Sequence, residues 1–212
     1  VVRGLDDCFE NTGQSCNAPT RMLVERSIYD KAVEIAAETA QKTRVASAHD
    51  SGGHIGPVVN AAQFDKIQGL IQKGIDEGAR LVAGGLGRPE GLNRGYFVRP
   101  TVFADVNNNM TIAREEIFGP VLSIIPFEGE AEALAIANDT PYGLTNYVQS
   151  QDGARRNRMA RALRSGMVEM NGKSRGRGAP FGGMKASGIG REGGVWGIED
   201  FLEIKAVSGW SN

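Results

Sequence analysis

The spacing of apolar residues predicts two long amphipathic helices in the first half of the chain. In the first, apolar residues recur at intervals of three and four from Ala32 to Ala40, and Ser27-Ile-Tyr-Asp30 before it has the spacing of a capping box. In the second, the same intervals run from Phe64 to Ile75, and Gly78 provides the C-terminal cap. Shorter helices are predicted at Glu130 to Asn138, Asp152 to Leu163 and Ile198 to Phe201.

Short apolar and β-branched runs alternate with these helices. They predict strands at Arg21 to Val24, Arg80 to Ala83, Phe97 to Phe103, Val121 to Phe127, Tyr147-Val148, Met167 to Met170 and Glu203 to Val207. Pro100 lies within one of these runs and indicates an edge position or a bulge. Because strands alternate with helices, we predict an α/β fold, a three-layer αβα domain with a mainly parallel sheet. We expect one domain covering residues 1–212.

The composition is that of an ordinary soluble protein. Charged residues make up 23% of the chain and the net charge is -1, so no general attraction to nucleic acid or to an anionic membrane is expected. No apolar run approaches the roughly 18 residues of a membrane span, and no signal peptide opens the chain. Two cysteines form no disulfide framework, and this favours the reducing environment of the cytoplasm.

The stretch Asn11-Thr-Gly-Gln-Ser-Cys16 is the leading candidate for chemistry. It sets a thiol at the end of a small polar turn, where backbone N–H groups are free to face a substrate. A thiolate is the strongest nucleophile among ordinary side chains near neutral pH, so Cys16 is the candidate covalent catalyst. The alternative is that Cys16 is a small buried apolar residue, which is our interpretation of Cys8 on the apolar face of a helix-like run.

A second stretch, Glu115-Glu-Ile-Phe-Gly-Pro120, leads into a predicted strand. Side chains of an extended segment alternate, so Glu116 and Phe118 face the same way. The carboxylate can accept hydrogen bonds from sugar hydroxyls, while the aromatic ring offers a wall to a flat heterocycle. The competing interpretation is a capping glutamate and a core phenylalanine.

Three weaker patterns receive structural interpretations. Gly188-Ile-Gly-Arg-Glu-Gly193 matches GxGxxG, but a loop rather than a strand precedes it, so it is not interpreted as a dinucleotide fingerprint. His49 and His54 lie in one glycine-rich loop without a further ligand cluster, so no metal site is expected. The basic residues between positions 173 and 177 lack interleaved stacking aromatics, which argues against nucleic-acid binding.

With these residues in view, the chain resembles the C-terminal, thiol-bearing catalytic domain of NAD(P)-dependent aldehyde dehydrogenases over nearly its whole length. The resemblance rests on four motifs in the family's order: Asn11-Thr-Gly-Gln-Ser-Cys16, Glu115-Glu-Ile-Phe-Gly-Pro120, Asn138 with Tyr142-Gly-Leu144, and Pro180-Phe-Gly-Gly183 followed by Lys185, Ser187-Gly188 and Gly190-Arg-Glu192. It implies oxidation of a small-molecule aldehyde to a carboxylic acid, with NAD or NADP as cofactor and NAD favoured.

The resemblance also implies roles for single residues. Cys16 is the nucleophile and its own N–H is one oxyanion donor, Glu116 binds the nicotinamide ribose, and Phe118 contacts the nicotinamide region. The thiolate adds to the aldehyde, a hydride leaves the thiohemiacetal, and water hydrolyses the resulting thioester. The residues implied to line the aldehyde's path are Ser15, Asn17 and Phe181.

The chain departs from the family's pattern at its N-terminal side. Family members carry their nucleotide-binding domain, the glutamate base, an oxyanion-hole amide and the cofactor-phosphate lysine upstream of the region that matches Val1. We therefore expect a fragment of about half an enzyme that is inactive, or nearly so, by itself. Residues 203–209 match a strand that pairs subunits in the family, which implies a homo-oligomeric full-length enzyme.

Substrate class and alternative functions complete the expectations. The cations at positions 173 to 177 precede Phe181 and suit the guidance of an anionic semialdehyde; the alternative is that they are solvated and face away. A cysteine-dependent hydrolase, in which His49 or His54 activates Cys16, is a second hypothesis. It requires a histidine within hydrogen-bond reach of the thiol. A non-catalytic interaction domain is the third.

Overall fold

The computed structural model describes residues 1–211, which form two compact units. The first is Val1–Thr140 and the second begins at Pro141. The sequence analysis expected one domain, and nothing in the composition marks residue 140 as a boundary.

The first unit is built on a four-stranded sheet with the order β1-β4-β3-β2. Its strands are β1 (Arg21–Glu25), β4 (Val121–Phe127), β3 (Thr101–Ala104) and β2 (Arg80–Ala83). The strand β4 is parallel to both of its neighbours: Arg21 of β1 is paired with Ser123, and Thr101 of β3 is paired with Val121. The strand β2 is antiparallel to β3. The prediction of a mainly parallel sheet is confirmed.

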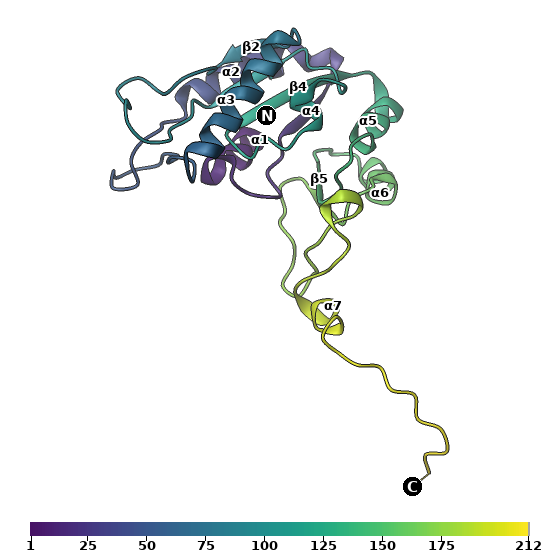
Figure 1. The fold of residues 1–212 in the computed structure, drawn as a ribbon. Helices are drawn as coiled ribbons and strands as arrows, with labels where there is room; N and C mark the ends of the chain where they lie inside the picture. The colour runs from purple at the N-terminus through teal and green to yellow at the C-terminus, as the bar shows by residue number, and fades with distance from the viewer. Residues whose placement is uncertain (212) are drawn as a thin grey trace. The chain divides into compact units, whose positions relative to one another are not determined.

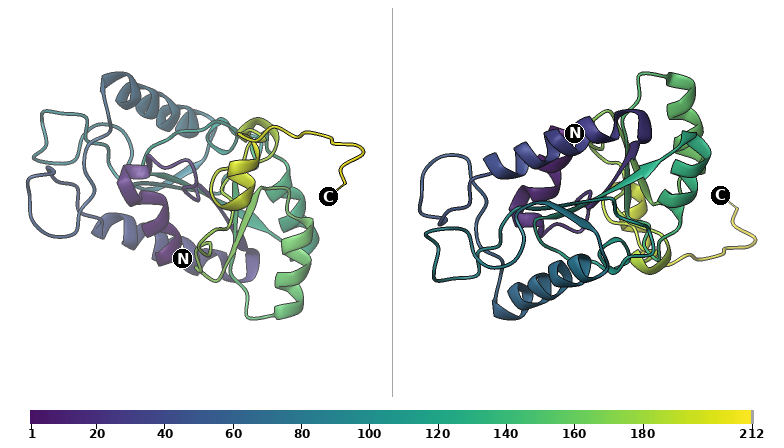
Figure 2. Two further views of the ribbon diagram at one scale, coloured as in Figure 1. Left: turned by 90° about the horizontal axis from the view of Figure 1, so that it is seen from below. Right: turned by 90° about the horizontal axis from the view of Figure 1, so that it is seen from above.

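Helices cover both faces of this sheet. Alternate side chains of the central strand β4 point to opposite faces, and apolar residues on both faces pack against helices. Leu122 and Ile124 pack with α1 (Val2–Phe9) and α2 (Tyr29–Lys42). Val121 and Ile125 pack with α3 (Ala61–Asp76) and the short α4 (Thr111–Arg114). Figure 2 shows α2 and α3 on opposite sides of the strands, so the three-layer prediction is confirmed. The unit closes with α5 (Gly129–Asn138).

The second unit contains a two-stranded parallel sheet of β5 (Thr145–Val148) and β6 (Met167–Met170) (Figure 1). The helix α6 (Gly153–Ala162) connects them, and the Asp152 carboxylate caps it by accepting hydrogen bonds from two backbone N–H groups. A 3-10 turn (Lys185–Ser187) and α7 (Gly194–Glu199) follow. The glycine pattern at Gly188 therefore follows a turn and not a strand, as the sequence analysis expected.

Two local predictions are wrong, the capping box before α2 and the C-terminal strand. The helix α2 begins at Tyr29 without a side-chain cap, because the Ser27 hydroxyl donates to the Glu25 carboxylate at 3.0 Å instead. The predicted helical turn at Ile198 to Phe201 is present, with Phe201 N–H donating to the Ile198 carbonyl at 2.9 Å, and the helix α7 that leads into it already begins at Gly194. Residues 203–207 form no strand within the described chain, since no neighbouring strand offers them a ladder of hydrogen bonds. The pairing of residues 203–209 with another subunit stays a prediction.

Pro100 lies immediately before the start of β3. The strand that follows is interior rather than at an edge, and the irregularity in pairing falls on the neighbouring β2 between Leu81 and Ala83. The predicted extended run therefore forms regular strand only from Thr101 onward.

Two buried acidic groups between helices and sheet predict that the protein loses stability in alkali. Burial raises the pKa of the Cys8 thiol from 9.0 to about 12, and burial is also the main cause that raises the pKa of Tyr29 from 10.0 to about 12. Raised folded-state pKa values mean that the unfolded chain releases these protons first. The stabilising contribution is therefore complete below pH 9 and is lost as the pH rises toward 12.

The measurement is urea unfolding at several pH values. For Cys8 alone, the unfolding equilibrium constant should rise about tenfold between pH 8 and pH 10. Cys8→Ala should flatten this dependence, whereas Val24→Ala, which removes buried atoms but no titrating group, should lower stability equally at every pH. An unchanged slope in Cys8→Ala would contradict the assignment.

Candidate active site

Cys16 is exposed in a turn that follows α1 and a short 3-10 segment. The chain leaves α1 through a 3-10 segment (Glu10–Gly13) in which Asn11 and Thr12 have φ values of 49° and 60°. Non-glycine residues adopt this left-handed region at a cost, and such residues are concentrated at functional sites. Asn11 and Gln14 hold the bend through reciprocal side-chain to carbonyl hydrogen bonds of 3.0 Å each. The turn that carries Cys16 is then closed by Ala18 N–H donating to the carbonyl of Ser15 at 3.1 Å.

The thiol turn is fastened to the loop at residues 56–59. The buried Thr12 hydroxyl donates to the carbonyl of Gly56 at 3.0 Å. Gln14 accepts from the N–H of Val59 at 2.8 Å and donates to the carbonyl of Pro57 at 3.5 Å. These bonds fix the backbone on the N-terminal side of Cys16, while its side chain stays exposed.

The backbone of Gly13 lies directly against the backbone of Gly119 and Pro120. A Cβ atom added at Gly13 would overlap the Gly119 carbonyl, and Gly13 also has a φ of +72°. Only glycine satisfies both conditions. This contact brings Asn11-Thr-Gly-Gln-Ser-Cys16 and Glu115-Glu-Ile-Phe-Gly-Pro120 side by side, although about a hundred residues separate them in the sequence.

The second stretch is held by α3. The Gln63 side-chain amide donates to the carbonyls of Ile117 and Phe118, both at 2.9 Å. Phe118 itself has a φ of 55° and is half-buried, whereas Glu116 is exposed. Within the described residues the Glu116 carboxylate has no hydrogen-bond or ion-pair partner, so it is free to accept bonds from a ligand.

Cys8 is excluded as a nucleophile by its position. It is fully buried on the side of α1 that faces β4, and its thiol lies 3.7 Å from the carbonyl of Val121. The raised pKa of about 12 keeps it protonated at neutral pH. The interpretation of Cys8 as a core residue is confirmed, and Cys16 is the exposed thiol of the chain.

The two histidines do not activate Cys16 in this structure. The His54 ring nitrogens lie 3.0 Å from the Asp50 carbonyl and 3.4 Å from the Ile55 carbonyl, within their own loop. His49 is exposed in the same loop. Among residues 1–211 neither ring has a hydrogen bond to the Cys16 thiol, so the geometry that the hydrolase hypothesis requires is absent there.

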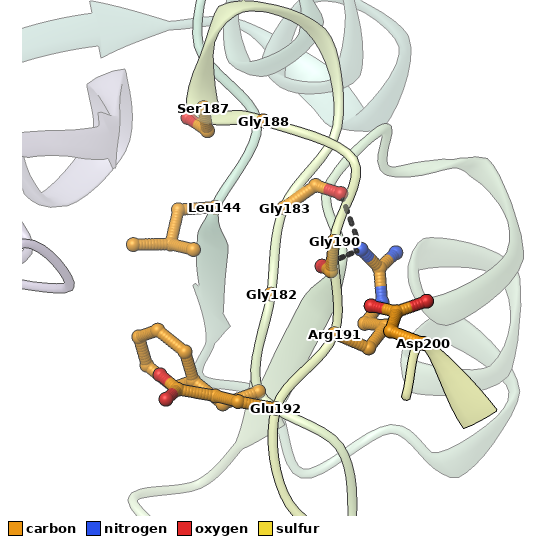
Figure 3. A pocket seen from close by; sticks show the side chains of 10 residues that line it. Leu144, Gly182, Gly183, Ser187, Gly188, Gly190, Arg191, Glu192 and Asp200 are labelled. Carbon is orange, nitrogen blue, oxygen red and sulfur yellow. Dashed lines mark hydrogen bonds between the residues drawn. The ribbon is translucent and has the colours of Figure 1, made fainter. Parts of the chain in front are cut away.

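Phe181 belongs to the second unit and is described within it. Its backbone forms an antiparallel bridge with Glu192, with both hydrogen bonds at 2.8 Å. The guanidinium of Arg175 lies 4.8 Å from the centre of its ring, so this cation does not simply face solvent. The surrounding glycine segments are held by Arg191, which donates to the carbonyls of Gly183 and Gly190 at 2.7 Å and 2.9 Å (Figure 3).

In the part of the chain that the structure describes, no group of three or more His, Cys, Asp or Glu side chains is placed to hold a metal ion. None of the helices there is long and apolar enough to cross a membrane.

The residues that hold the site together are not recognisable from the sequence alone. Gln63 carries no signal, because a glutamine on a helix surface is ordinary. Gln14 lies inside the recognised thiol turn, but its bonds to residues 57–59 depend on a loop whose path the sequence does not reveal. Gly13 and Gly119 lie within the two motifs. A glycine in each motif is the one feature of the sequence that is compatible with a close approach of the two backbones.

Comparison with known proteins agrees with this arrangement. Residues 1–207 match the aldehyde dehydrogenase family. The chain is 50% identical over 210 residues to a 3-succinoylsemialdehyde-pyridine dehydrogenase of a Pseudomonas species, covering 99% of this chain and 44% of that protein. This chain therefore belongs to the aldehyde dehydrogenase family.

Solved structures give the same result for the fold. An aldehyde dehydrogenase from Bartonella henselae is 62% identical with a TM-score of 0.96, over 98% of this chain and 44% of that one. The C291A mutant of aldehyde dehydrogenase C from Pseudomonas syringae, in complex with NAD+ and octanal, is 47% identical with a TM-score of 0.96, over 99% of this chain and 43% of that one. The chain thus spans less than half the length of these relatives, and the predicted α/β fold class is confirmed.

Proposed function

We propose that this chain is the nucleophile-bearing, C-terminal part of an NAD(P)-dependent aldehyde dehydrogenase that oxidises an aldehyde to a carboxylic acid. The observation that carries the proposal is the backbone contact of Gly13 with Gly119 and Pro120, because it brings together the two sequence stretches that contain Cys16 and Glu116. The NAD+ and octanal bound to the related Pseudomonas syringae enzyme support the same chemistry.

The proposed reaction begins at Cys16. Its thiolate adds to the aldehyde carbon to form a thiohemiacetal, and the backbone N–H of Cys16 is one donor to the oxyanion. Loss of a hydride from that carbon leaves a thioester on Cys16. Water then adds to the thioester carbon and the thiolate leaves, which releases the acid and restores the thiol.

The chain's residues fit a nicotinamide cofactor. Glu116 presents an exposed carboxylate, without a protein partner in the described structure, to accept hydrogen bonds from ribose hydroxyls. Phe118 offers an aromatic face on a backbone fixed by Gln63. When bound, the cofactor accepts the hydride. NAD is favoured over NADP in this proposal, because the related structures are complexes with NAD+.

Further parts of the proposal concern the whole protein. Ser15, Asn17 and Phe181 line the aldehyde's path, and the full-length enzyme is a homo-oligomer. A catalytic free thiolate is consistent with a reducing compartment, so we propose a cytoplasmic location.

The proposal is tested by NADH absorbance on mixing the full-length protein that contains this chain with NAD and an aldehyde. Sustained NADH formation, together with release of the corresponding acid, is expected. The chain 1–212 alone should be slower by at least about 10²-fold, because in this proposal the general base and most of the cofactor site belong to the rest of the protein. Release of acid from esters without any aldehyde-dependent NADH formation by the full-length protein would favour the hydrolase instead.

The role of Gln63 leads to a prediction about cofactor binding. In the full-length protein, Gln63→Met leaves two carbonyls of the Ile117-Phe118 segment without their donor. Losing such bonds costs about 1–3 kcal/mol, so the KM for NAD should rise about tenfold or more. The matched control is Gln72→Met on the same helix, whose side-chain amide donates to the exposed Asp76 carboxylate at 2.7 Å. Equal effects of the two substitutions would contradict the positioning role of Gln63.

A further inference from the structure

A half-buried arginine lies just after the thiol turn. Arg21 is the first residue of β1 and follows Cys16 by five positions. Its guanidinium donates to the Asn108 side-chain oxygen at 2.5 Å and to the carbonyls of Ile136 and Ala137 at 3.2 Å each. These carbonyls belong to the last turn of α5, the negative end of the helix dipole. Arg21 therefore ties the strand that follows the thiol to the C-terminal end of α5.

Two more side chains extend this contact to the cofactor motif. Asn108 turns its amide nitrogen to Asp139, donating to its carboxylate at 2.8 Å and to its carbonyl at 2.9 Å. Arg114 donates to the same carbonyl at 3.0 Å and pairs with the carboxylate at 3.1 Å. Arg114 is the last residue of α4 and precedes Glu116 by two positions. We call Arg21, Asn108, Arg114 and Asp139 the polar clamp.

The chemistry of the polar clamp is unusual for a purely stabilising contact. Among residues 1–211, Arg21 has no ion pair with a carboxylate. Burial together with the charge of Arg114 lowers its pKa, while Asp139 acts in the opposite sense. Hydrogen bonds from Arg114 and Asn108 lower the pKa of Asp139. The ion pair of Arg114 with Asp139 is solvent-exposed, and an exposed ion pair adds little stability. The hydrogen bonds of the polar clamp position its segments relative to one another, because each hydrogen bond favours a particular direction.

We infer that the polar clamp is a positioning device for the hydride transfer: it fixes the strand after Cys16 and the segment before Glu116 to the same C-terminal end of α5, Arg21 through the carbonyls of Ile136 and Ala137 and Arg114 through Asp139. This inference rests on the proposed function. The thiol turn is already tied to the cofactor motif on its N-terminal side through Gly13, and the polar clamp supplies the second tie on its C-terminal side. Two ties are needed to set both the distance and the orientation of the thiol-bound carbon.

The test compares two reactions of Cys16 in the full-length protein. Aldehyde-dependent NADH formation requires the thiol-bound carbon and the cofactor to be correctly positioned relative to each other. Acylation by p-nitrophenyl acetate does not: the thiolate attacks the ester carbonyl, the acetyl group forms a thioester, and p-nitrophenolate leaves as a countable burst. With Arg21→Met or Asp139→Leu, kcat/KM for NADH formation per active site should fall about 10- to 100-fold, while the acylation rate constant stays within about threefold.

Conservative and control variants complete the test. Asp139→Asn retains an acceptor for Asn108 and should recover much of the NADH activity that Asp139→Leu loses. Arg80 lies on β2, at the edge of the sheet, and forms an exposed ion pair with Asp105. Arg80→Met removes this ion pair and should change neither reaction. The amplitude of the p-nitrophenolate burst gives the concentration of folded active sites. Rates are divided by this concentration, so a variant that folds poorly can still be compared. Parallel losses in both reactions, or no loss, overturn the inference alone; absence of NADH formation in the unmodified protein overturns the inference and the proposed function together.

Discussion

Replacing Gly13 by alanine is expected to destroy the site and to destabilise the first unit by about 3 kcal/mol or more, because overpacking and a left-handed backbone each carry a cost. The added Cβ atom would overlap the carbonyl of Gly119, and no flexible side chain is there to move away. Either the thiol turn or the Glu115–Pro120 segment must shift. Aldehyde-dependent NADH formation by the full-length protein should therefore become undetectable.

Gly69→Ala is the matched control for this substitution. Gly69 lies within α3, where an added Cβ atom meets nothing within 4 Å, so the change should leave activity intact and raise stability by about 0.5–1 kcal/mol. Urea unfolding and NADH formation measure both variants. A fully active and stable Gly13→Ala protein would contradict the backbone contact on which the proposed function depends.

The second large effect is expected from Cys16→Ala. Removal of a covalent nucleophile typically costs 10⁴-fold or more in kcat, so NADH formation should fall by at least about 10⁴-fold. The thermal midpoint should hardly change, because Cys16 is exposed. Cys8→Ala should behave in the opposite way, keeping most of the activity while losing stability, because Cys8 is fully buried. Loss of activity in Cys8→Ala with retention in Cys16→Ala would reverse our assignment of the two thiols.

Much of the fold was predictable because the signals are local. The apolar spacing identified α2 and α3, and the β-rich run at Val121–Phe127 matches β4 in both bounds. The capping box failed because Ser27 has a nearer partner in Glu25, which a spacing rule does not register. The C-terminal strand failed because apolar alternation shows that a segment can pair, not that a partner strand lies beside it.

The site was predictable in its chemistry but not in its assembly. The residue types of the two motifs identified a thiol and a carboxylate, but nothing in the sequence showed that the backbones of Gly13 and Gly119 meet. The residues that fix the geometry, Gln63 and the polar clamp, are ordinary polar residues whose partners are distant in the sequence. Only the folded chain reveals their roles.

The central claim is that Cys16 forms the covalent intermediate of an oxidation coupled to NAD. Its most direct test is rapid acid quenching of the full-length protein during turnover with aldehyde and NAD, followed by mass spectrometry of the peptides that contain the two cysteines. We predict a mass increase equal to the acyl group of the substrate on the Cys16 peptide, dependent on NAD, with the Cys8 peptide unmodified. NADH formation without any acylated Cys16, or an acyl group on Cys8, would contradict the account.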